Sequence, residues 1–334
     1  MSALASSAVT ADRLLIDAEQ ETERIVVAMR DVVRRTMRRQ GAIVGVSGGI
    51  DSAVTLALCA RAFGPQRTRA LLMPEADSSA DTLHLSRSVA EAFGVEAVLE
   101  DITPILAATR CYERRDEAVR SVVPGYGAGW RFKIVLPSVL GTDAYRMFRL
   151  VAESPDGERH EARLPAPAYL TIVAATNFKQ RVRKTMDYFH ADRLNYAVVG
   201  TPNRLEYELG FFVKLGDGAA DVEGIEGMYK SELYVLAKAM GVDQRVIDRT
   251  PTTDTLPAQK SQKGYFYGLD FATLDTALQV FEESLPLETA CQRTGLTEPQ
   301  MKQLVENLRR RNTTTTILRS PPLGIGRSPI AHLL

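Results

Sequence analysis

One segment near the N-terminus constrains the fold of this 334-residue chain more than any other. Residues 42–46 are an apolar run, residues 47–52 read Ser-Gly-Gly-Ile-Asp-Ser, and a helical pattern follows. Glycines let a backbone approach a ligand closely, and the N–H groups of the turn and of the opening helix point towards one position. The segment therefore predicts a strand, a phosphate-binding turn and a helix in direct succession.

The turn differs from the two better-known glycine loops. It lacks the Lys-Ser/Thr ending of a Walker loop and the spaced glycines of a dinucleotide fingerprint, and it suits pyrophosphate. With Asp51 available to hold magnesium, the predicted chemistry breaks ATP between its α- and β-phosphates while backbone amides and metal stabilise the departing charge. The alternative is a glycine turn that serves packing alone, and the strand–turn–helix context favours the phosphate site.

The flanking pattern predicts an α/β fold with a doubly wound parallel sheet. Helices are expected at 53–62 and 81–93, and strands at 69–73 and 95–99. Short strands that alternate with helices indicate a parallel sheet covered on both faces. In such sheets ligands bind beyond the carboxyl ends of the strands, where Ser47 and Pro74-Glu75 fall.

We expect one domain over residues 1–334, with four additions to the sheet. These are an N-terminal helix (1–40, helical from Ala11 to about Arg39), an insertion at 112–167, a mobile lid loop at 250–268, and two or three C-terminal helices at 271–311. Alternation on either side of Asp156-Gly157 predicts a β-hairpin within the insertion. A helix at about 168–190 and a strand at 195–199 return the chain to the sheet.

Composition excludes several classes of function. Lys+Arg and Asp+Glu both total 41, so no global field recruits nucleic acid or an anionic membrane. Cys59, Cys111 and Cys291 lack metal-type spacing, and we interpret them as packing residues in a reducing compartment. Neither a signal peptide nor a membrane span is visible, so we expect a cytoplasmic protein.

Charged residues downstream of the turn fall where a nucleotide site would need them. Asn177, Arg181 and Lys184 share one helical stripe, with Arg183 off it, and a solvated basic face is the alternative. Thr201 and Glu206 follow a strand directly, so both are expected to face the same crevice as Asp51. A second carboxylate there would complete a magnesium site. A glycine-rich acidic turn from Lys214 to Asp221 and a helix opening at Lys230 follow, each with a plain loop as the alternative.

Taken together, these segments resemble the N-type ATP pyrophosphatases, and specifically the NAD synthetases, whose fold is adenine nucleotide α-hydrolase-like. The motifs are Ser47–Ser52, Asn-x-Lys-x-Arg-x-Arg, Gly-Thr-x-Asn-x-x-Glu, Lys-x-Gly-Asp-Gly-x-x-Asp and Pro251-Thr252, all in family order. The resemblance implies ATP contacts from Gly45, Val46, Ser47, Gly48, Gly49, Ile50, Asp51, Ser52, Thr201, Lys230 and Thr252. It implies Mg2+ at Asp51 and Glu206, and contacts to the carboxylate substrate deamido-NAD from Arg181, Lys214 and Asp221.

The resemblance also implies a mechanism and an assembly. The acid attacks the α-phosphate of ATP, pyrophosphate leaves, and ammonia displaces AMP from the acyl adenylate. Asp51, Lys214 and Lys230 are the expected catalytic residues, because handling two polyanions needs cations and no side-chain nucleophile. A homodimer is expected, with the first helix contributing, and the segment 250–268 would exclude water as a lid.

Three departures from the family pattern leave the acid open. Pro202 stands where many members have an acid, a C-terminal His-Lys pair is missing from Arg309–Thr314, and the insertion is extra. The alternatives are a similar ligase for a different carboxylic acid, a related pyrophosphatase acting on tRNA, and a non-catalytic nucleotide sensor. About forty residues precede the loop, too few for an amidase domain, so free ammonia or a separate glutaminase is the expected nitrogen source.

Overall fold

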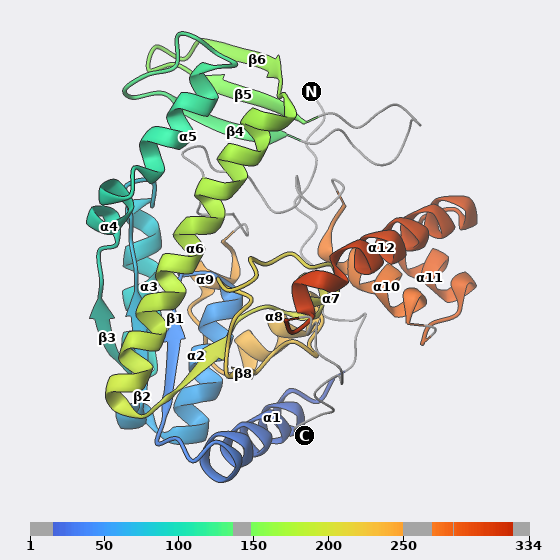
Figure 1. Ribbon diagram of the computed structural model, residues 1–334. Coiled ribbons are helices and arrows are strands. Elements are labelled where there is room, and N and C mark those ends of the chain that lie inside the picture. The colour runs from blue at the N-terminus through green and yellow to red at the C-terminus, as the bar shows by residue number, and fades with distance from the viewer. Residues whose placement is uncertain (1–15, 136–147, 250–268, 283, 323–334) are drawn as a thin grey trace, which may run out of the picture.

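The computed structural model describes residues 16–135, 148–249, 269–282 and 284–322 (Figure 1). Its main sheet has five parallel strands in the order β3-β2-β1-β7-β8. The strands are β1 (Ala42–Gly45), β2 (Thr68–Leu72), β3 (Glu96–Leu99), β7 (Ala197–Gly200) and β8 (Val222–Glu223). This arrangement confirms the predicted parallel α/β fold, and it brings the ends of β1, β2 and β7 to one edge.

Alternate residues of the central strands explain the two layers of helices. Val44 of β1 packs with α1 (Ala18–Asp31), α2 (Ile50–Phe63), α3 (Ala80–Ala92) and α8 (Lys230–Ala239) in one apolar core. Ile43 faces the other way and packs against the long helix α6 (Ala166–Leu194). Successive strand residues point to opposite faces, so these fully buried neighbours sandwich the sheet.

The insertion is a second, three-stranded antiparallel sheet. It contains β4 (Arg131–Val135), β5 (Arg149–Glu153) and β6 (Arg159–Arg163) in that order. The β5–β6 pair confirms the predicted hairpin, and Gly157 turns it with a φ of +89°. Figure 1 shows α6 running from this sheet along the main sheet.

Sequence periodicity missed three elements before α6. They are α4 (Thr103–Ala108), α5 (Cys111–Arg120) and β4. Helix α5 starts after Arg110, which adopts a left-handed φ of +58°. Most residues of α5 are charged, so its narrow apolar stripe is hard to recognise in the sequence. Ala118 and Val119 on that stripe pack against Phe132 of β4 and Ile172 of α6, so tertiary burial stabilises both elements.

The first helix and the C-terminal helices differ in detail from the expectation. Asp17 caps α1, and after a π-helical turn (Val32–Thr36) Arg38 takes a left-handed φ of +57°, so the helix ends before Arg39. The C-terminal helices are α10 (Phe271–Phe281), α11 (Leu287–Thr294) and α12 (Glu298–Arg319). Two short helices, α7 (Arg204–Glu208) and α9 (Gln244–Ile247), and a 3-10 turn (Pro65–Arg67) complete the described elements.

The lid predicted at 250–268 lies outside the described residues and stays a prediction. None of the helices in the described part of the chain combines the length and apolarity needed to cross a bilayer.

Candidate active site

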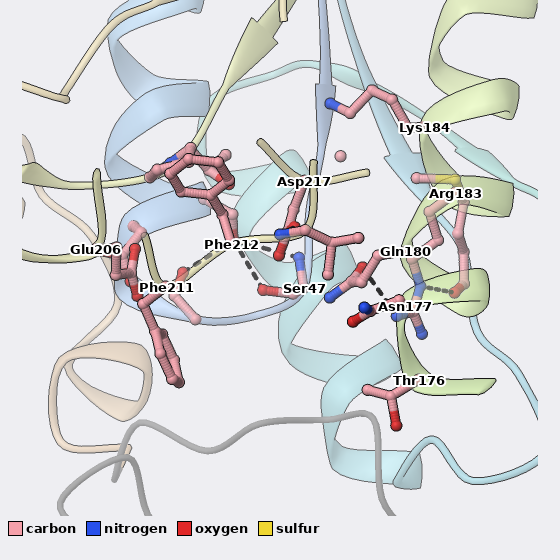
Figure 2. A pocket seen from close by; sticks show the side chains of 18 of the residues that line it. Ser47, Thr176, Asn177, Gln180, Arg183, Lys184, Glu206, Phe211, Phe212 and Asp217 are labelled. Atoms are coloured by element: carbon pink, nitrogen blue, oxygen red, sulfur yellow. Dashed lines mark hydrogen bonds between the residues drawn. The ribbon is translucent and has the colours of Figure 1, made fainter. Parts of the chain in front are cut away.

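A cavity of about 650 Å3 lies at the carboxyl edge of the parallel strands. The β1–α2 loop, the end of β2, one face of α6 and the segment after β7 line it. In Figure 2 the labelled α6 residues Asn177, Gln180 and Arg183 lie on one side of Ser47, and Glu206 lies on the other. The cavity therefore occupies the position that the strand–turn–helix segment predicts for a ligand.

The β1–α2 loop has the geometry of an anion site. Gly48 adopts a left-handed φ of +69°, and Gly49 is the N-cap of α2, where no side chain of the described residues caps the first helical N–H groups. The Ser52 hydroxyl accepts a bond from the Ser47 amide (3.2 Å) and donates one to the Gly49 carbonyl (3.0 Å). Arg249 donates to the carbonyl oxygens of Ser47 and Gly48 at 3.3 and 3.2 Å. The start of α2 thus keeps N–H groups for a negative ligand in the cavity.

Three segments meet around Asp51 on the first turn of α2. Its Oδ2 accepts a bond from Lys230 Nζ at 2.5 Å, and its Oδ1 accepts one from Asn203 Nδ2 at 2.9 Å. Asn203 also caps α7: its Oδ1 accepts from the Glu206 amide, and its own amide donates to Glu206 Oε2. The cap thereby places the Glu206 carboxylate beside Asp51, as the sequence predicts.

The pair of carboxylates has the electrostatics of a cation site. Burial, and then the charge of Asp51, raises the pKa of Glu206 to about 8, although Lys230 opposes both effects. Burial lowers the pKa of Lys230, but Asp51 and Glu206 outweigh it and hold that pKa above its ordinary value. Two carboxylates and phosphate oxygens are ligands that suit Mg2+, so this donor set fits the ion. Within the described residues no cluster of three or more His, Cys, Asp or Glu could hold a metal.

Helix α6 contributes the polar wall of the cavity. The predicted stripe of Asn177, Arg181 and Lys184 does line it, but Arg183, expected off the stripe, lines it too. Arg183 has a long side chain that reaches the end of β2, where Nε donates to the Met73 carbonyl at 3.3 Å. Lys184 is buried and paired with Asp187 at 3.1 Å, so the solvated-face alternative is wrong for this residue.

The three expected contacts to the acid substrate have separate surroundings. Lys214 lines the cavity, and its Nζ donates to the Ile317 and Ser320 carbonyls at the end of α12 (2.8 and 2.7 Å). Arg181 lines it as well, and its Nε donates to the Lys214 carbonyl at 3.3 Å. Asp221 is not one of the residues that line the cavity, and its carboxylate accepts a bond from the Val198 amide at 2.9 Å.

Of the remaining residues predicted to contact ATP, some line the cavity and others do not. Thr201 lines the cavity, as do all loop residues from Gly45 to Ser52 except Gly48. Lys230 lies behind Asp51, fully buried, with its Nζ 5.4 Å from the ring centroid of Phe271. Thr252 lies outside the described residues.

The sequence reasoning missed several residues that line the cavity. Arg249 is one, and Arg311 is another, with Nε bonded to the Leu209 carbonyl at 3.1 Å. Phe211 and Phe212 line it beside Glu206. The run Arg309–Arg311 offered a signal, because a helix turns consecutive residues to different faces, but only the docking of α12 identifies which arginine points inward.

Comparisons with known proteins agree with this geometry. The family model described as NAD synthase matches residues 21–124 and 158–315, so its gap contains β4 and β5. An NH(3)-dependent NAD(+) synthetase of Rhizobium rhizogenes is 48% identical over 317 residues, covering 95% of this chain and 96% of the relative. One of Thermotoga maritima is 36% identical over 246 residues, 73% of this chain and 81% of the relative.

Solved structures share the fold at lower identity. The NMN synthetase of Francisella tularensis superposes with a TM-score of 0.64 at 19% identity, covering 93% of this chain and 99% of that one. The NH3-dependent NAD synthetase of Campylobacter jejuni gives 0.62 at 22%, covering 93% and 100%. The family model matches on both sides of residues 125–157 and a relative aligns along nearly the whole length, so this chain belongs to the NAD synthase family.

Proposed function

We propose that this protein is a carbon–nitrogen ligase that amidates deamido-NAD with ammonia at the expense of ATP, forming NAD, AMP and pyrophosphate. One observation carries the proposal: a single cavity joins the amide-rich start of α2, the Asp51–Glu206 carboxylates and an arginine-rich wall. Relatives that carry the name NH(3)-dependent NAD(+) synthetase align along 93% or more of the chain.

The nucleotide half of the reaction belongs to the β1–α2 loop. A carboxylate oxygen of the acid attacks the α-phosphorus of ATP, and the bond to the oxygen that bridges α and β breaks. The N–H groups at the start of α2 receive the pyrophosphate, because they are fixed in place before any charge develops. Magnesium held by Asp51 and Glu206 would neutralise charge on the phosphate oxygens. Lys230 and Asn203 orient Asp51 for that role.

We assign the acid half of the reaction to the basic side chains that line the cavity. Arg181, Arg183 and Arg311 face the cavity with Lys214, and guanidinium groups suit the paired oxygens of carboxylates and phosphates. Asp221 fits a positioning role, because its bond to the Val198 amide holds β7, the strand that ends at Thr201. Ammonia then attacks the acyl carbon, and AMP leaves with the electron pair of the cleaved acyl–oxygen bond.

The nitrogen source, the assembly and the cellular site complete the proposal. We propose free ammonia or a separate glutaminase as the source, and a homodimer to which α1 contributes. A cytoplasmic site suits three cysteines that remain free thiols, two of them buried.

Product analysis tests the proposal. Purified protein with Mg-ATP, ammonium and deamido-NAD should release AMP, pyrophosphate and NAD in equal amounts. Release of ADP, or no pyrophosphate that depends on deamido-NAD, would contradict it. A panel of other carboxylic acids, run in parallel, separates this activity from a ligase of the same family with a different acid.

A further inference from the structure

A buried lysine on α6 has no part in the chemistry described above. The side chain of Lys179 has no exposed surface, and its Nζ bonds to Glu75 Oε1 at 3.0 Å and to Asp77. Both acids belong to the loop that follows β2. Lys179 lies within the Asn-x-Lys-x-Arg-x-Arg motif, yet it is not one of the residues that line the cavity.

A second cation enters the cluster from α5. Arg115 is 5% exposed, and its guanidinium pairs with Asp77 and, at 2.8 Å, with Asp116. The Tyr112 hydroxyl donates to Glu75 Oε2 at 2.8 Å and accepts a bond from the Ala76 amide at 3.3 Å. The buried carboxylates of the loop are thus matched by cations from two helices, as buried charges require.

The same contacts fix the course of the loop. Glu75 Oε2 accepts a bond from the Asp77 amide at 3.1 Å, and the Ser78 hydroxyl accepts one from the Glu75 amide at 3.1 Å. Pro74 and Ser78 line the cavity, and β2 is the neighbour of β1, which ends at the phosphate loop. Lys179 therefore acts on the nucleotide side of the cavity, through the backbone of residues 74–78.

The cluster also reaches the insertion. The Arg115 guanidinium lies 5.7 Å from the ring centroid of Phe132, a fully buried residue of β4. Phe132 belongs to the apolar core that β4 and β5 share with α5 and α6. Arg115 therefore contacts both that core and Asp77.

We propose that Lys179, Glu75, Asp77 and Arg115 form a positioning network that holds residues 74–78 in place at the ATP side of the cavity. Through this network the insertion sheet supports ATP binding. The inference rests on the proposed function for the identity of ATP as the nucleotide. Among the described residues, removing Lys179 leaves the Glu75 carboxylate with the Tyr112 hydroxyl and the Asp77 amide, neither of which is cationic, so we expect residues 74–78 to rearrange.

The first test is Lys179→Met, with Lys302→Met as the matched control. Lys302 forms an exposed ion pair with Glu298, so its loss removes a lysine pair without touching the cavity. We expect Lys179→Met to raise KM for ATP about tenfold while kcat and KM for the acid stay within about threefold. Lys179→Arg, which keeps the charge, should recover part of the ATP affinity. A variant that is only less stable, with unchanged KM for ATP, overturns the proposal.

The second test keeps every charge paired, so it does not depend on Lys179→Met folding. Tyr112→Phe removes only the hydroxyl that links Glu75 to the Ala76 amide, and it should weaken ATP binding about threefold. Unchanged ATP affinity in folded Tyr112→Phe contradicts the network. Calorimetric titration with ATP alone measures both variants without turnover. A wild type that binds ATP but forms no NAD would refute the proposed function and still leave the network testable.

Discussion

Lys230 Nζ lies 2.5 Å from Asp51 Oδ2, and this contact joins the first turn of α8 to the first turn of α2. Lys230 is fully buried, whereas the Asp51 side chain retains 18% of its exposure and faces the cavity. The ammonium group of Lys230 therefore offsets the negative charge of Asp51 and Glu206 from the side away from the cavity. The side of Asp51 that faces the cavity stays open to a ligand.

The carboxylate pair should be indispensable for turnover. Asp51→Asn and Glu206→Gln each remove a negative ligand of the proposed magnesium site, so we expect kcat to fall by about 10²-fold or more with the fold intact. Pyrophosphate release measures activity, and circular dichroism measures the fold. Asp31→Asn, which alters an exposed pair with Arg35, is the matched control. Normal turnover in either site variant would refute the metal role of that residue.

Lys230 should matter for stability as well as for activity. Lys230→Met leaves Asp51 and buried Glu206 without their cation, a change that typically costs about 3–5 kcal/mol in the free energy of unfolding. Urea denaturation measures this cost. The double variant Asp51→Asn/Lys230→Met should lose less than the sum of the single losses, because it removes both members of the pair. Additive losses would show that the two residues are not coupled.

Lys214 should discriminate between the two substrates. In Lys214→Met we expect KM for deamido-NAD to rise about tenfold and KM for ATP to change little, because Lys214 lines the cavity next to Arg181 and is not part of the phosphate loop. The Ile317 and Ser320 carbonyls also lose their donor, so amide exchange in the last turn of α12 should accelerate. A rise confined to KM for ATP would reverse the assignment.

Glu223 should make stability depend on pH. Burial raises its pKa to about 8, with Glu226 and Asp217 acting in the same direction and Lys184 against it, and its Oε2 is buried without a hydrogen-bond partner among the described residues. Between pH 4.5 and about 8 the folded state holds a proton that the unfolded state has lost, so the free energy of unfolding falls as pH rises.

The variant Glu223→Gln removes the carboxyl group that titrates. We expect it to match the wild type near about pH 5 and to exceed it near about pH 9, by an amount on the order of a few kcal/mol. Urea titrations at both pH values measure the difference, and Glu298→Gln, an exposed acid on α12, serves as control. Parallel curves for wild type and Glu223→Gln would show that this carboxyl does not titrate in that window.

Gly48 should be irreplaceable for a steric reason. A Cβ there would lie 3.0 Å from both Leu85 Cβ and the Thr82 carbonyl oxygen, so in Gly48→Ala either the loop or its neighbours on α3 must shift, and we expect weaker ATP binding. Gly157→Ala is the matched control, because that hairpin glycine also has a positive φ but meets no atom within 4 Å. Both substitutions carry backbone strain of about 1–3 kcal/mol, and only the first is expected to change ATP affinity.

The sequence by itself determined the framework of the protein. Residues 42–54 predict a strand, a glycine turn and a helix through local rules of spacing and conformation, and the structure has β1, the loop and α2 there. The same rules predict the turn at Asp156-Gly157. The predicted strand at 195–199 also places Glu206 just after β7, whereas the Asn203 cap that orients Glu206 is a finding of the structure.

Only the tertiary structure decided which side chains meet. Lys179 and Arg183 lie four residues apart on α6. Lys179 is buried against the loop that follows β2, whereas Arg183 lines the cavity. Arg311 lines the cavity because α12 docks there, and the bond from the Val198 amide to the Asp221 carboxylate joins two segments that the sequence does not pair. Local spacing fixes the direction of a side chain relative to its own helix or strand. Its partners depend on how the separate elements pack, and the energy of that packing comes from residues distant in sequence.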